Sequence, residues 1–146
     1  MQSLSAHLLF LSIFGLTEVR GSEQSVAIEG RLLCGLLPAV DVDVQLWSMD
    51  SGFDSDEILS EGRTDSNGYF HLHGWTAEIL RIDPQLRIFH QCKYPLRIGY
   101  RKVVFTIPKD YVTDGVVPGK TVNLETIQLE MLHEGEEIKL PFTKVK

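Results

Sequence analysis

Hydrophobic and polar side chains alternate with a period of two along several short stretches of the chain. In residues 40–47, four aliphatic residues alternate with Asp41, Asp43, Gln45 and Trp47. A period of two places successive side chains on opposite faces of a β-strand, so this pattern predicts a strand that is buried on one face. Alternation or a β-rich composition predicts further strands in residues 26–34, 69–75, 86–92, 101–107 and 121–129.

Turn-forming residues separate these stretches, and none of them has the pattern of a long helix. Residues 64–68 read Thr-Asp-Ser-Asn-Gly, and Asn-Gly supplies the positive φ angles that a tight hairpin needs. Pro108 ends one predicted strand, and residues 109–115 are expected to contain one short helical turn. The pattern therefore predicts an all-β fold, an antiparallel β-sandwich of about seven strands.

The N-terminus differs from the rest of the chain, because residues 8–16 read LLFLSIFGL. This run is shorter than the roughly 20 residues that cross a bilayer, but it has the length of a signal-peptide core. We predict a signal peptide in residues 1–21, one β-sandwich domain in residues 22–137 and a flexible C-terminal tail in residues 138–146. A buried strand or a membrane anchor is the alternative interpretation of residues 8–16. No second long apolar run follows, so we expect a secreted protein that is not an integral membrane protein.

The chain has two cysteines, Cys34 and Cys92. An even number of cysteines in an oxidising compartment favours a disulfide, and both residues are in phase with the apolar faces of their predicted strands. Two free, buried thiols are the alternative. There is no Cys-x-x-Cys motif, which excludes a thioredoxin-type redox site.

The formal net charge is −6, from 14 Lys and Arg against 20 Asp and Glu, which argues against a general nucleic-acid binder. Residues 41–61 contain seven carboxylates and no basic residue. Asp50, Asp54, Asp56 and Glu61 partly resemble a calcium loop, but the EF-hand spacing fails, and we interpret this stretch as a solvated loop.

The basic residues concentrate in residues 81–102. This segment contains six of them: Arg81, Arg87, Lys93, Arg97, Arg101 and Lys102. If they gather on one sheet face, they would form a patch for an anionic partner or lipid headgroups. Alternation along the strands would scatter them instead.

Two histidines, His71 and His73, lie two residues apart on a predicted strand and therefore point to one side, together with Tyr69 and Trp75. Three interpretations are open: a solvated strand face, a binding surface, or a pair of metal ligands that lacks a third and fourth member. His90 falls on an apolar face and is expected to be a core residue. As a possible interaction surface we name Tyr69, His71, His73, Trp75, Arg97, Arg101 and Lys102.

Catalytic motifs are missing from the sequence. There is no Gly-x-Ser-x-Gly, no phosphate-binding loop and no dinucleotide fingerprint. We therefore expect no catalytic residue, no cofactor and no bound metal.

Five stretches in order resemble the nematode transthyretin-like family of small secreted proteins. They are VAIEGRLLCG (26–35), DEILSEGRTDSNGYFHLHG (56–74), IDPQLRIFHQC (82–92), RKVVFTIPKDYVTDG (101–115) and TVNLETIQLE (121–130). The resemblance implies a transthyretin-like β-sandwich, secretion, and a bridge between Cys34 and Cys92. The positions of a second cysteine pair found in many relatives hold Gly99 and Leu140 here, so we expect the tail to be less tethered.

The resemblance implies a fold, but it implies no specific biochemical activity. We expect a secreted, non-catalytic binding protein that contacts an extracellular protein or cell-surface partner. The alternative is a carrier or sensor of a small apolar ligand or lipid headgroup. A hydrolase of the hydroxyisourate hydrolase type is a more remote alternative, because residues 143–146 lack the Tyr-Arg-Gly-Ser terminus of those enzymes.

Overall fold

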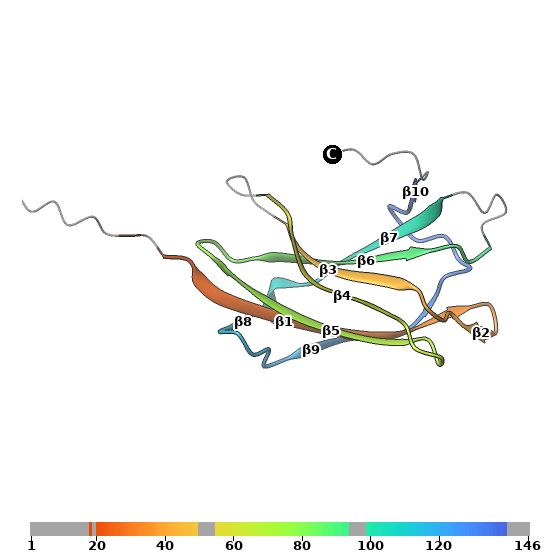
Figure 1. Ribbon diagram of the computed structural model, residues 1–146, viewed down its shortest axis with the longest axis horizontal. Helices are drawn as coiled ribbons and strands as arrows, with labels where there is room; N and C mark the ends of the chain where they lie inside the picture. Colours follow the sequence, from red (N-terminus) through yellow and green to blue (C-terminus); the bar gives the residue numbers. More distant parts are fainter. Residues whose placement is uncertain (1–17, 19, 50–54, 94–98, 140–146) are drawn as a thin grey trace, which may run out of the picture.

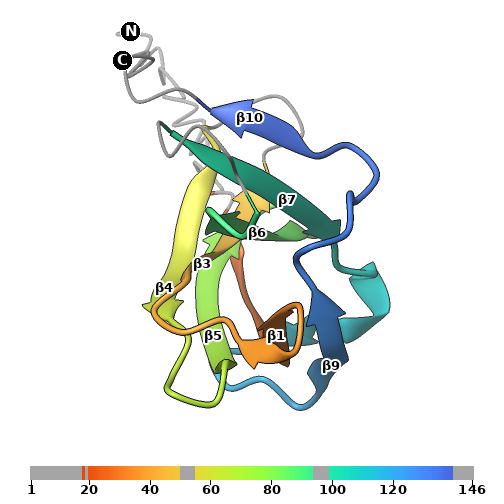
Figure 2. The same cartoon turned by 90° about the vertical axis from the view of Figure 1, so that its right-hand side faces the viewer.

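A computed structural model describes residues 18, 20–49, 55–93 and 99–139. The described chain forms two β-sheets packed face to face (Figures 1 and 2). Seven of its strands have seven residues or more, and they are β1 (Ser22–Cys34), β3 (Asp43–Met49), β4 (Glu57–Arg63), β5 (Tyr69–Glu78), β6 (Asp83–His90), β7 (Tyr100–Thr106) and β9 (Thr121–Gln128). The shorter elements are β2 (Leu37–Pro38), the 3-10 turn η1 (Lys109–Tyr111), β8 (Thr113–Asp114) and β10 (Glu137–Lys139).

Strand β1 is the centre of the first sheet. Along one side it pairs antiparallel with β5 from Ser22 to Arg31, and along the other it pairs parallel with β9. The short strands β2 and β8 pair with the remaining positions of β1. The second sheet has the order β10-β7-β6-β3-β4 and is antiparallel throughout.

The hydrophobic core lies between the sheets and is built from the inward residues of alternating strands. Strand β6 alternates strictly between buried and half-buried positions, as does β3, so each gives one face to the core. The fully buried aliphatic residues are Val26, Ile28, Leu32, Val44, Leu46, Leu86, Ile88, Val103, Ile107 and Leu129.

One side of the sandwich is closed by a close approach of β4 to β5, which lie side by side in Figure 2. A Cβ atom added to Gly74 would lie 2.5 Å from the carbonyl oxygen of Leu59, so only glycine fits there. The two strands are joined by a turn at residues 64–68, as predicted, but they belong to different sheets, so the turn does not close a paired hairpin. Its Asp65 carboxylate accepts hydrogen bonds from the N–H groups of Asn67 and Tyr69, and Gly68 adopts a φ of 81°.

The predicted all-β sandwich is confirmed, as is the short helical turn expected in residues 109–115, which is η1. Two local predictions need correction. Residues 57–61, interpreted as part of a solvated loop, belong to β4. Ile138, placed in the flexible tail, lies in β10 and pairs with Arg101 of β7; residues 140–146 lie outside the described residues.

A disulfide joins Cys34, the last residue of β1, to Cys92, two residues beyond the end of β6. The two Cα atoms are 5.7 Å apart. The predicted bridge is therefore present, and it ties the two sheets together at one end of the sandwich.

We predict that removing this disulfide lowers the free energy of unfolding by about 2–5 kcal/mol, because the unfolded chain gains freedom. The measurement is the urea midpoint of the oxidised protein, the reduced protein and the Cys34→Ser/Cys92→Ser variant. The reduced protein and the double variant should unfold at the same, lower urea concentration. A double variant as stable as the oxidised protein would contradict the prediction.

Candidate functional site: the outer face of β5

Four side chains of β5 form a continuous row on the outer face of the first sheet: Tyr69, His71, His73 and Trp75. We call them the outer row. All four are exposed, with Tyr69 at 53% and Trp75 at 52%, while Phe70 and Leu72 between them are buried in the core. The rings of His71 and His73 are in contact, with centroids 5.9 Å apart. The prediction that these four residues share one side of a strand is confirmed.

Strand β1 lies beside the outer row, and its side chains border the row on one side. Ala27 is paired with His73 and Ser25 with Trp75, and both small residues are buried. Further along, Arg31 is paired with Tyr69 and places its guanidinium 5.3 Å from the ring centroid, a cation–π contact.

A hollow of about 460 Å³ adjoins the outer row at Tyr69 and His71. It forms where the pairing of β1 with β9 shifts register between Glu29 and Arg31, and where Glu125 has a φ of 56°. The polar and charged residues that line it are Glu29, Arg31, Asp65, Tyr69, His71, Asn123, Glu125 and Thr126. With three carboxylates and one guanidinium, the hollow favours a cation.

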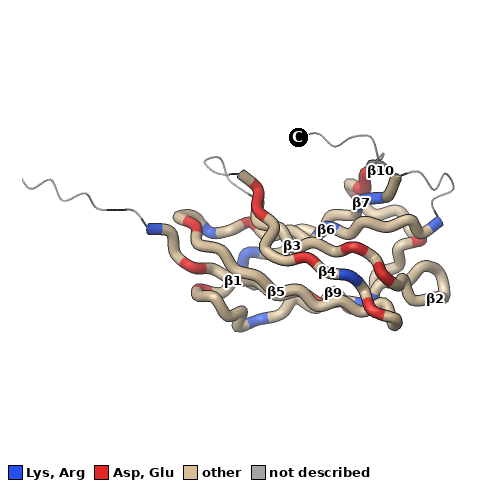
Figure 3. The backbone as a smooth tube through the Cα atoms, viewed as in Figure 1, with Lys and Arg blue, Asp and Glu red and all other residues tan. Residues whose placement is uncertain are grey.

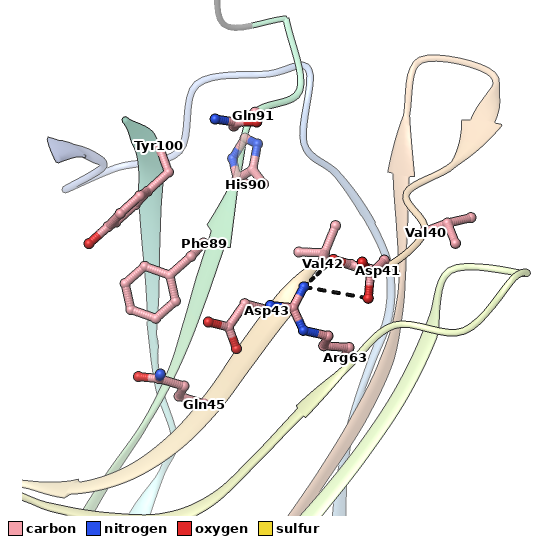
Figure 4. Close-up of a pocket in the computed structure, with 10 residues that line it drawn as sticks. All are labelled: Val40, Asp41, Val42, Asp43, Gln45, Arg63, Phe89, His90, Gln91 and Tyr100. Atoms are coloured by element: carbon pink, nitrogen blue, oxygen red, sulfur yellow. Dashed lines mark hydrogen bonds and ion pairs between the residues drawn. The ribbon is translucent and has the colours of Figure 1, made fainter. Parts of the chain in front are cut away.

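A second hollow, also about 460 Å³, lies on the second sheet (Figure 4). Phe89 and Tyr100 form one wall, with their rings edge to face and their centroids 5.3 Å apart. On the opposite wall, Arg63 donates a hydrogen bond to the carbonyl oxygen of Asp41 and lies 3.4 Å from its carboxylate. Asp43 and other polar side chains complete the lining, so this hollow is not an apolar cavity.

The sequence left open whether the basic residues of segment 81–102 gather into a patch, and the described ones do not form an unpaired patch. Every described member has an acidic partner, and Figure 3 shows blue and red positions interspersed along the strands. The pairs are Arg81–Asp114, Arg87–Asp56, Lys93–Glu130, Arg101–Glu136 and Lys102–Glu137. Arg97, named as a surface residue, lies outside the described residues. The charge available to an anionic partner is therefore low in the described part of this segment.

Arg101 was also predicted at the surface, and this is wrong, because its side chain is only 7% exposed. Its guanidinium donates to both carboxylate oxygens of Glu136 and to the carbonyl oxygens of Cys92, Leu129 and Met131. Its role is structural, joining β7 to the segment between β9 and β10.

His90 lies beside this ion pair and is buried, as predicted. Its Nδ1 accepts a hydrogen bond from the N–H of Cys92, whereas its Nε2 has no partner among the described residues. The pKa of His90 is lowered from 6.5 to about 4, mainly by burial and then by the charges of Arg101 and His133, while the charge of Glu136 opposes the shift. For Glu136, burial alone would raise the pKa, but the hydrogen bonds from Arg101 and from the N–H of His133, with the charge of Arg101, lower it below its ordinary value.

Sequence reasoning missed the residues that surround the outer row. Glu29 and Arg31 lie on β1, opposite His71 and Tyr69, and Asn123 follows on β9. The alternation in β1 did place Glu29 and Arg31 on the outer face. Their position beside β5 depends on a strand register that one sequence does not specify.

The fold and the exposed row define a small, disulfide-linked β-sandwich with one aromatic and imidazole-bearing face. A sequence model described as the transthyretin-like family matches residues 29–108. The chain therefore belongs to the transthyretin-like family. No helix in the described residues is long and apolar enough to cross a membrane.

Two curated relatives come from Caenorhabditis elegans. Transthyretin-like protein 46 is 44% identical over 133 residues, covering 90% of this chain and 74% of its own. Transthyretin-like protein 33 is 42% identical over 113 residues, covering 77% of this chain and 79% of its own. A solved structure of a 9R-lipoxygenase from Cyanothece gives a TM-score of 0.41 at 21% identity; the match covers 73% of this chain and 16% of the lipoxygenase.

We predict that His90 makes the protein less stable as the pH falls from 7 to 5. Because its pKa is lower in the folded protein (about 4) than in the unfolded chain (6.5), only the unfolded chain takes up a proton in this range. The free energy of unfolding should fall by up to about 1.4 kcal/mol per pH unit, below the pH at which the unfolded histidine titrates.

The measurement is urea unfolding between pH 7 and 5, where the lowered pKa of Glu136 keeps its carboxylate ionised in the folded protein. His90→Asn is the matched variant, since its side-chain oxygen can still accept the Cys92 hydrogen bond but does not titrate. It should show a flatter stability profile, and an unchanged slope would contradict this assignment.

Proposed function

We propose that this protein is secreted and works outside the cell as a non-catalytic binding protein, contacting a protein partner through the outer row. The observation that carries the proposal is the exposure of Tyr69 and Trp75, each about half exposed, on one regular strand. Aromatic residues are enriched in protein interfaces and dominate their binding energy. A rigid sheet also presents them without the entropy cost of ordering a loop.

Secretion is supported by two features. The disulfide between Cys34 and Cys92 is of a kind that persists in oxidising compartments. The apolar stretch in residues 8–16 has the length of a signal-peptide core, and the expected cleavage after Gly21 falls directly before the first residue of β1.

Other candidate functions have less support. A carrier of an apolar ligand needs an apolar cavity, and both hollows are bordered by charged side chains. Binding of lipid headgroups needs free basic residues, and those described in segment 81–102 are paired. His90, Arg101 and Glu136 come together inside the protein, where a substrate cannot reach them. The first hollow does bring together an accessible histidine, an arginine and a carboxylate, His71, Arg31 and Glu29, but the sequence around them carries no catalytic motif that would favour a hydrolase.

We predict that the full chain, expressed in animal cells with its own N-terminus, is found in the medium and begins at or within a few residues of Ser22. Its intact mass should rise by roughly 2 Da on reduction, the two hydrogens gained when one bridge opens. Mass spectrometry of the medium measures both. Retention in the cells, or a secreted protein that still carries residues 1–21, would contradict the proposal.

We predict that the Tyr69→Ser/Trp75→Ser variant loses its extracellular partner. Truncating aromatic anchors at the centre of an interface should weaken binding by about tenfold or more. Biotinylated mature protein is used to capture proteins from extracellular fluid, followed by quantitative mass spectrometry and a titration with the recovered partner.

Leu36→Ser is the matched control, because it removes an apolar side chain that is fully exposed but lies away from β5. It should retain the partner that the double variant loses. If the same proteins are captured with both variants and with the wild type, the outer row is not the contact surface.

A further inference from the structure

We propose that His71 and His73 together chelate one divalent transition-metal ion of the class that imidazole binds best, copper or zinc. The inference concerns the outer row but does not depend on a protein partner. From the sequence, this pair was expected to bind no metal, because a site usually has a third and a fourth ligand. The structure adds three observations about the pair and its surroundings.

The first observation is the geometry of the two rings. An imidazole nitrogen bonds Zn²⁺ at about 2.0–2.1 Å, so two rings that share one ion have centroids roughly 5–6 Å apart. The centroids of His71 and His73 are 5.9 Å apart on one face of a strand. Because β5 is paired with β1 along its length, the backbone keeps both side chains on one face of the sheet, two residues apart.

The second observation is that both imidazoles are exposed and uncommitted. Neither ring has a hydrogen bond or ion pair with another described residue, in contrast to His133, whose Nε2 donates to the carbonyl oxygen of Gln128. An ion can therefore reach lone pairs on both rings without breaking a protein contact.

The third observation is the charge and space beside His71. Glu29 is its cross-strand partner on β1, and the adjoining hollow also contains Asp65 and Glu125. Three carboxylates against the single guanidinium of Arg31 attract a dication. The hollow also leaves room for the water or other ligands that complete the coordination.

The chain itself supplies two ligands. Among the described residues no group of three His, Cys, Asp or Glu side chains is placed to hold a metal. Such a two-imidazole site is open and exchangeable, and by the usual order of affinities it binds Cu²⁺ more tightly than Zn²⁺. Its affinity falls as the pH falls, because a protonated imidazole has no lone pair for the metal.

The test is titration of the untagged, mature, disulfide-bonded protein with Cu²⁺ and, separately, Zn²⁺, followed by calorimetry. We expect one Cu²⁺ per chain, with electron paramagnetic resonance showing nitrogen couplings from two imidazoles. His71→Gln and His73→Gln should each weaken Cu²⁺ binding at least tenfold. His133→Gln is the matched control for losing a histidine elsewhere, and it should bind Cu²⁺ as the wild type does.

Wild-type affinity in the His71→Gln/His73→Gln variant, or a spectrum without two nitrogen ligands, would overturn the proposal. Both substitutions are at exposed positions, so circular dichroism should show that the variants keep the wild-type fold. The experiment contains no protein partner, so loss of metal binding and failure of the proposed partner contact are separate results.

Discussion

The buried guanidinium of Arg101 is the interaction on which one whole end of the sandwich depends. It bonds the carboxylate of Glu136 and three carbonyl oxygens, from Cys92, Leu129 and Met131. These groups come from the end of each sheet and from the crossing segment between β9 and β10. Removing the partner of a buried charge typically lowers the free energy of unfolding by about 3–5 kcal/mol. The ion pair with Arg101 therefore fixes the position of the segment between β9 and β10. The disulfide joins the same region covalently, since Cys92 supplies both the bridge and one of the carbonyl oxygens.

This buried ion pair sets the character of its surroundings. His90 stays neutral beside it because a second cation in the same interior would be repelled as well as desolvated. The pairing of β10 with β7 follows Glu136 directly, so the C-terminal strand is anchored without a second disulfide. The chain lacks the second cysteine pair that many relatives have, but it is nevertheless tethered at least through Lys139.

The regular parts of the fold were predictable because they follow a period of two with one buried face. Strand β5 is the clearest case, since its alternation placed both Phe70 in the core and His71 outside. Strand β4 was missed because Glu57, Ile58, Leu59 and Ser60 do not alternate, and its pairing with β3 shifts register near Leu46. This strand is at the edge of its sheet, where burial imposes a weaker pattern on the sequence.

Arg101 is a residue whose burial could not be predicted from the period of two. The alternation places Arg101 on the same side of the strand as Val103 and Ile107, which is the core side. A charged residue is nevertheless expected at the surface unless a buried partner is known. That partner, Glu136, lies 35 residues away and on a connecting segment. Only the tertiary structure brings the two together. The sequence left the arrangement of the basic residues in segment 81–102 open for the same reason, since each described one has its acidic partner in a distant part of the chain.

The outer row differs from all of these features because the fold does not need it. The core closes beneath β5 with Phe70 and Leu72, and polar residues at positions 69 and 75 would leave that packing intact. Exposed single hydrophobic residues need no explanation, but two large aromatics that flank two contacting imidazoles on one strand form a connected surface. Stability therefore does not account for the outer row, and this is the reason for proposing it as a contact surface.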